Sequence, residues 1–142
     1  MSEGALSATL HRATLRAVVA TYYDLNATFF RRSLRSPAFA FSDVDGRLGR
    51  WVGEQRTIEL SSSLLTDHGW GVLVEVLKHE MAHQFVEEVL GAPQSAHGPA
   101  FQRVCEERGF DASAAGTPVT VDPASARGKV LDWNDGTGHV FV

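Results

Sequence analysis

The stretch VLKHEMAHQFVEE, from Val76 to Glu88, places two histidines four positions apart and a glutamate directly after the first. On a helix His79 and His83 share nearly one face, because four residues rotate by about 400°. Two such imidazoles can bind one zinc ion. Glu80, rotated by about 100° from His79, flanks this face and can take a proton from an attacking water. The stretch therefore predicts a catalytic zinc site with Glu80 as its base.

The residues around the two histidines favour this interpretation over its simplest rival. Val76, Leu77, Met81 and Phe85 make the predicted helix apolar around the motif. Polar side chains among them would be partly buried, and buried polar groups need partners. A metal ion is such a partner. The rival interpretation is an ordinary amphipathic helix that carries two surface histidines.

A catalytic zinc site needs a third protein ligand, because it usually keeps three and leaves the fourth position to water. His97 is the best-placed candidate. It follows the helix stop at Gly91–Pro93 by a short loop and directly precedes a new helix, so the chain can return toward the first two histidines. The remaining histidines have no such route, and we interpret them as surface or packing residues: His11, His68 and His139.

Supporting residues are harder to assign from the sequence. Ligating histidines usually donate their second N–H to a carboxylate or carbonyl, and Glu75 and Glu87 lie four positions before His79 and after His83. Solvated carboxylates at the helix edge are the alternative. Four residues are available to stabilise the oxyanion of a hydrolytic reaction: Arg50, Arg103, Tyr22 and Tyr23.

The rest of the chain predicts an α+β fold. Apolar residues at spacings of three and four predict helices over about residues 5–34, 70–90 and 98–109. Alternating or β-prone stretches predict short strands at 38–43, 47–52 and 56–61. The turn-forming run Asp43–Arg47 separates the first two strands. A small antiparallel sheet packed against helices is the expected assembly.

The C-terminal stretch has a different composition. We assign residues 1–111 to the main domain and residues 112–142 to a small, turn-rich connector followed by a β-hairpin around Asn134–Gly136. The hairpin resembles the first two strands of a cold-shock domain, in which strand aromatics stack on single-stranded nucleic acid. A hairpin that completes the domain's own sheet is the alternative.

Composition limits the remaining classes. The 142 residues suffice for one domain, 44% are hydrophobic, and a formal net charge of −4 does not favour general attraction to nucleic acid. The one cysteine, Cys105, excludes a disulfide within this sequence and a cysteine-built zinc ribbon. The sequence shows no signal-peptide pattern and no apolar run approaching the roughly 20 residues of a membrane span. We therefore expect a cytoplasmic protein without a membrane-spanning part.

With these residues assembled, the sequence resembles the SprT-like zinc metallopeptidases, the family that includes the Spartan-type proteases. The resemblance covers about residues 10–111. It rests on HEMAH followed by HGPAF, on RLGRWVGEQRTIELSSSLL ahead of them, and on YYDLNATFF in the first helix. Three blocks in the same order are more specific than the five-residue motif alone.

The resemblance implies that His79, His83 and His97 bind zinc and that Glu80 is the general base. It also implies a minimal zincin-like fold, with helices on a small antiparallel sheet and a peptide substrate along a sheet edge near the zinc. Family members often carry a cysteine zinc ribbon or another segment that targets DNA, and no such ribbon can form from this sequence. Association with DNA therefore has less support than hydrolysis.

Three functional hypotheses remain open. The first is a zinc-dependent endopeptidase that acts on proteins, including DNA-associated ones. The second is a zinc-stabilised nucleic-acid-binding or interaction module with a vestigial peptidase site, for which the run RRSLRS from Arg31 to Ser36 and the terminal hairpin with Trp133 would supply the contacts. The third is a regulatory protease with one dedicated partner. The sequence does not decide the oligomeric state.

Overall fold

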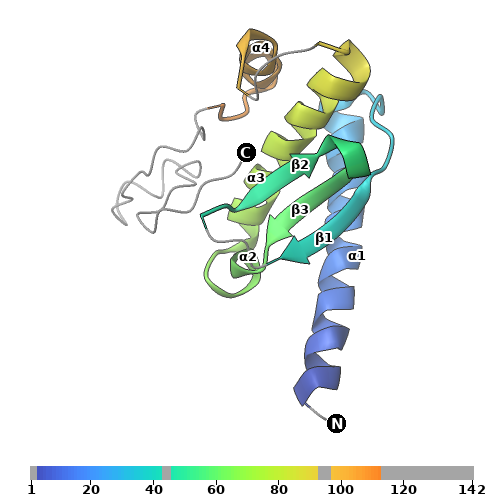
Figure 1. Ribbon diagram of the computed structural model, residues 1–142, viewed down its shortest axis with the longest axis vertical. Helices are drawn as coiled ribbons and strands as arrows, with labels where there is room; N and C mark the ends of the chain where they lie inside the picture. Colours follow the sequence, from blue (N-terminus) through green and yellow to red (C-terminus); the bar gives the residue numbers. More distant parts are fainter. Residues whose placement is uncertain (1–2, 43–45, 93–96, 113–142) are drawn as a thin grey trace.

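The computed structural model describes residues 3–42, 46–92 and 97–112. These residues form four α-helices and one three-stranded sheet, so the expected α+β class is confirmed (Figure 1). In chain order the elements are α1 (Glu3–Phe30), β1 (Ala38–Ser42), β2 (Gly49–Val52), β3 (Thr57–Ser61), α2 (Ser63–Thr66), α3 (Trp70–Gln84) and α4 (Pro99–Arg108). A 3₁₀ turn, Gly53–Gln55, joins β2 to β3, and a π-helical segment, Phe85–Leu90, continues α3.

The sheet is mixed, so the expectation of a purely antiparallel sheet is wrong. β3 lies in the centre, parallel to β1 and antiparallel to β2. The chain reverses once between β1 and β2 and again at the 3₁₀ turn, so β1 and β3 run in the same direction. The Ile58 and Leu60 side chains of this central strand are fully buried, and α3 packs against it.

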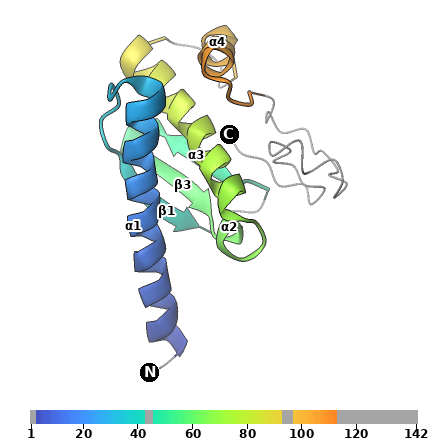
Figure 2. The ribbon, with the colours of Figure 1, turned by 180° about the vertical axis from the view of Figure 1, so that it is seen from behind.

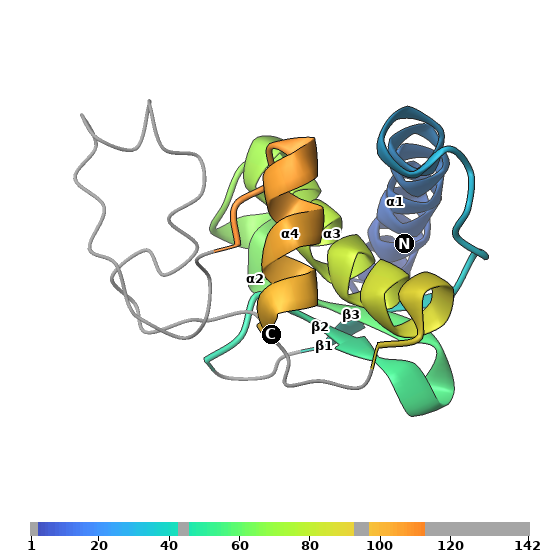
Figure 3. The same ribbon diagram turned by 90° about the horizontal axis from the view of Figure 1, so that it is seen from above.

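Helices α1 and α3 cover one face of the sheet (Figure 2). Among the described residues, no helix covers the other face (Figure 1). Helix α4 packs against α3 (Figure 3). The side chains that fill the space between these elements include Tyr22, Phe30, Leu48, Ile58, Leu60, Leu73, Leu77, Met81 and Phe101. The motif helix α3 therefore lies on the sheet with α1 on one side and α4 on the other (Figure 3), which buries most of its surface.

Helix α1 ends at Phe30, four residues before the predicted end. Arg31 and Arg32 adopt left-handed backbone angles, with φ of 53° and 61°. The Arg32 N–H donates to the Asn26 carbonyl at 2.9 Å. The buried Asn26 side chain donates to the Leu34 carbonyl at 2.9 Å and accepts from the Leu34 N–H at 3.2 Å. A buried asparagine thus ends the helix by binding the chain that follows it.

The two helices around the histidines follow the prediction closely. The π-helical continuation of α3 ends at Leu90 and is followed by Gly91, whose φ of 61° is left-handed and favours glycine. α4 begins with Pro99 in its first turn and ends at Arg108, followed by Gly109 with φ of 72°. The sequence did not predict the widening of the last six helical residues, 85–90, into a π-helix.

The predicted connector and hairpin fall almost wholly outside the described residues, which end at Ala112. The proposed division into residues 1–111 and 112–142 therefore stays a prediction, as does the role of Trp133. Within the ranges that the structure describes, no helix has both the length and the apolarity needed to cross a membrane.

A buried hydrogen bond joins α1 to α3 and leads to a stability prediction. The Tyr22 hydroxyl donates to Gln84 Oε1 at 2.9 Å, and Gln84 Nε2 donates to the Arg35 carbonyl at 2.7 Å. Tyr22→Phe would leave a buried acceptor without its donor, so we expect the free energy of unfolding to fall by about 1–3 kcal/mol. Urea denaturation measures this. Tyr23→Phe, at an exposed neighbour, is the control, and an equal effect of both variants would contradict the prediction.

Candidate metal centre

Helix α3 and the residue before α4 bring three histidines together. His79 and His83 come from α3, and His97 lies two residues before α4. One ring nitrogen from each lies within 4.8 Å of the others, and His79 Nε2 lies 3.2 Å from His97 Nε2. Two nitrogens on one tetrahedral zinc ion would be about 3.3 Å apart. The structure therefore brings together all three residues that the sequence proposed, in a group able to hold a metal ion.

Burial keeps these imidazoles neutral. It is the main cause that lowers the pKa of His79 well below the usual histidine range, and proximity to His83 and His97 lowers it further. Burial, together with His97, lowers the pKa of His83 to about 3. The pKa of His97 is also lowered by burial. A metal ligand must be an unprotonated imidazole, so the cluster has the protonation state that metal binding requires.

Two ring nitrogens show that the cluster fits a metal ion. His83 Nε2 is buried and has no hydrogen-bond partner among the described residues. His79 Nδ1 donates to the Asp111 carbonyl at 3.3 Å, which leaves its Nε2 as the unprotonated nitrogen. A buried acceptor without a partner is costly, and a metal ion would satisfy it.

The carboxylates proposed to support the histidines lie elsewhere. Glu75 accepts from Lys78 Nζ at 2.9 Å, and Glu87 accepts from the indole N–H of Trp51. The observed partner of His79 is instead the main-chain carbonyl of Asp111. The sequence could not indicate this contact, because every residue carries a carbonyl.

The Phe101 ring packs against all three histidines of the cluster. Its ring stacks on His83, with centroids 4.1 Å apart and planes 17° apart. It meets His79 and His97 edge-on, at centroid distances of 4.8 and 5.1 Å. Phe101 is fully buried and lies one helical turn after His97. The HGPAF block therefore supplies both a histidine of the cluster and an apolar ring that excludes water from one side of it.

Glu80 is buried between α3 and strand β2. It is fully buried, and neither carboxylate oxygen has a hydrogen-bond partner among the described residues. Burial raises the pKa of Glu80 well above its usual range. The backbone of Trp51 and the positive charge of Arg50 lower this pKa and so oppose part of the shift. A Cβ added at Gly49 would lie 3.3 Å from Glu80 Cγ, so the carboxylate-bearing side chain lies against β2.

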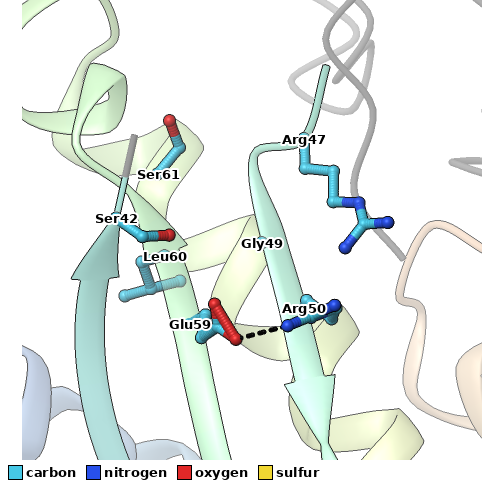
Figure 4. Close-up of a pocket in the computed structure, with 7 residues that line it drawn as sticks. All are labelled: Ser42, Arg47, Gly49, Arg50, Glu59, Leu60 and Ser61. Atoms are coloured by element: carbon cyan, nitrogen blue, oxygen red, sulfur yellow. Dashed lines mark hydrogen bonds and ion pairs between the residues drawn. The ribbon is translucent and has the colours of Figure 1, made fainter. Parts of the chain in front are cut away.

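The four candidates for oxyanion stabilisation are placed differently. Tyr22 is fully buried and its hydroxyl is bonded to Gln84. Arg50 reaches from β2 to Glu59 of β3, where the two side chains form an ion pair at 2.7 Å (Figure 4). Tyr23 and Arg103 are exposed on α1 and α4. Of the four, only Arg50 affects the pKa of Glu80.

The comparison with known protein families agrees with the motifs. The model of the SprT-like family matches residues 18–122, a range that contains Glu80 and all three clustered histidines. Among solved structures, the chain is similar to the metallopeptidase zymogen jannalysin of Methanocaldococcus jannaschii. The two chains are 9% identical, with a TM-score of 0.45, and the similarity covers 62% of this chain and 77% of that chain.

Proposed function

Because this chain belongs to the SprT-like family, we propose that it is a zinc-dependent endopeptidase that hydrolyses peptide bonds in protein substrates. One observation carries the proposal. Three histidines with lowered pKa values present nitrogens within 4.8 Å of one another, and the residue next to the first of them is a fully buried glutamate.

The proposed zinc ligands are His79, His83 and His97. Three neutral imidazoles are a donor set that catalytic zinc sites use, with the fourth position left for water or substrate. When bound there, zinc would polarise the scissile carbonyl and lower the pKa of the attacking water. Phe101 and the packing of α4 on α3 hold the imidazoles in place and restrict water around them.

Glu80 is the proposed general base. It would take the proton of the attacking water and deliver it to the leaving amine. Its two oxygens accept no hydrogen bond from a side chain of the described residues, so no other side chain holds the carboxylate in place. The backbone of β2 on one side and α3 on the other restrict where the carboxylate can go.

Strand β2 is the proposed support for the peptide. It is an edge strand, with β3 as its neighbour in the sheet, and edge strands bind extended peptides through main-chain hydrogen bonds. Because Glu80 lies against Gly49 of this strand, a peptide added along β2 would pass close to the proposed base. Recognition through the main chain would accept many peptide sequences.

Removal and return of the metal test this function. We expect purified protein to cleave a fluorescently labelled unfolded protein such as casein, to lose this activity after treatment with a chelator, and to regain it with zinc. Magnesium should not restore it, because imidazole nitrogens suit zinc better than magnesium. A preparation with one zinc per chain that leaves casein intact would contradict a general endopeptidase. It would favour a protease with a dedicated partner or a vestigial site.

DNA-associated proteins are one substrate class that we propose within this function. Adding DNA to the casein assay tests whether DNA changes the rate. The alternative function, a nucleic-acid-binding module, has less support. Arg31 and Arg32 are exposed, but the hairpin that would supply Trp133 lies outside the described residues.

A further inference from the structure

Gly49 allows strand β2 to lie unusually close to the motif helix. A Cβ at this position would be 2.6 Å from Val76 Cγ1, 3.3 Å from Glu80 Cγ and 3.3 Å from the Glu59 carbonyl oxygen. Gly49 is not among the residues with positive φ, so its backbone angles do not require glycine. The absence of a side chain is needed for space.

The two residues after Gly49 hold β2 in this close position. On the uncovered face of the sheet, Arg50 pairs with Glu59 of β3 at 2.7 Å, beside Gly49 (Figure 4). On the opposite face, the indole of Trp51 donates to Glu87 in the π-helical continuation of α3. Strand β2 is thus tied both to its neighbour and to the motif helix. Movement of β2 away from the motif helix would break the Trp51–Glu87 hydrogen bond, and movement away from β3 would break the Arg50–Glu59 ion pair.

This arrangement bears on Glu80 because strand β2 is the element that its side chain meets: Gly49 lies against Cγ, and the backbone of Trp51 is close enough to the carboxylate to lower its pKa. No hydrogen bond from a side chain of the described residues orients the carboxylate, and the residue is fully buried. The main chain of β2 at Gly49 is the surface that Glu80 Cγ meets. The free edge of the same strand, the one away from β3, is where the peptide is proposed to bind.

We propose that Gly49 is a positioning residue for Glu80. Its bare backbone sets how far the carboxylate lies from the edge strand, and therefore from a peptide bound to that strand. The inference rests on the proposed function, in which Glu80 is the general base. A methyl group at position 49 should displace the base relative to the substrate, which lowers the rate of the chemical step more than the binding of the peptide.

The contact can be tested without any activity. Gly49→Ala alone meets Val76 at 2.6 Å and could prevent folding, so the measurements use a Val76→Ala background. There, Gly49→Ala is expected to lower Tm by about 4 °C. When Glu80→Ala, which removes Cγ, is also present, Gly49→Ala should lower Tm by half as much or less. A loss of the same size with and without Glu80→Ala would show that Gly49 and Glu80 are not coupled, and would overturn the proposal.

Kinetics then test the positioning role. Compared with zinc-loaded Val76→Ala, the Val76→Ala/Gly49→Ala variant should lose about tenfold or more in kcat, with unchanged zinc content and KM within about twofold. Gly71→Ala on α3 is the matched control, because a Cβ there meets nothing within 4 Å; it should retain its kcat. A raised KM with unchanged kcat would overturn the proposal. If the parent protein cleaves nothing, the proposed function fails, and the stability measurement alone decides whether Gly49 holds Glu80.

Discussion

Replacement of Glu80 by glutamine is expected to reduce proteolysis by about 10²–10⁴-fold, the usual contribution of a general base, while the metal stays bound. Glutamine has nearly the shape of glutamate, so it should fit the fully buried site between α3 and β2. It cannot accept the proton of the attacking water at neutral pH. The measurements are kcat on an unfolded protein substrate and zinc content by elemental analysis of the same preparation.

The matched control is Glu75→Gln on the same helix. Glu75 pairs with Lys78 instead of the histidines, so its loss should leave kcat and zinc content close to the parent values. This control separates loss of the base from a general loss of carboxylate charge on α3. Full proteolysis by Glu80→Gln, with one zinc retained per chain, would exclude Glu80 as the base and with it the mechanism proposed above.

The sequence predicts the local part of this site well. The spacing of His79 and His83 fixes their shared face through the helical period, and the Gly91 stop with Pro99 at the next helix start predicts the turn that returns His97. These predictions depend on short-range rules that the structure obeys. The grouping of the three histidines could therefore be predicted without knowing how the rest of the chain packs.

The contacts that orient the site could not be anticipated in this way. Two of these contacts are made by main-chain groups, which no residue type marks. The Asp111 carbonyl accepts a hydrogen bond from His79 Nδ1, and the backbone of Gly49 lies against Glu80. The position of β3 between β1 and β2 is a long-range outcome as well. The predicted turn at Asp43–Arg47 indicates a reversal of direction, but it does not determine which strand becomes the hydrogen-bonded neighbour.

The site residues are held by two separate sets of contacts. The histidines depend on α3, on the start of α4 with Phe101, and on the Asp111 carbonyl. Glu80 depends on α3 and on β2 through Gly49. Loss of a contact in the first set should therefore weaken metal binding and activity together, whereas loss of a contact in the second should lower the rate and leave the metal in place.

His97→Ala should show the first of these behaviours most clearly. His97 is the one member of the cluster outside α3, and its removal leaves a two-histidine site on one helix. We expect zinc affinity to fall by at least about 100-fold, since even the loss of a hydrogen-bond partner of a ligand costs about 10–100-fold. The rate of proteolysis should decrease in proportion to the amount of zinc bound.

Metal binding should also be visible as stability, because a ligand that binds only the folded state raises Tm. Zinc should raise the Tm of the metal-free parent and should raise that of His97→Ala much less at the same concentration. His68→Ala, at a histidine outside the cluster, is the control and should respond as the parent does. One zinc retained by His97→Ala would mean that the third ligand is another group. A parent that binds no zinc after reconstitution would remove the basis for a metallopeptidase, and the binding-module hypothesis would then become the leading one.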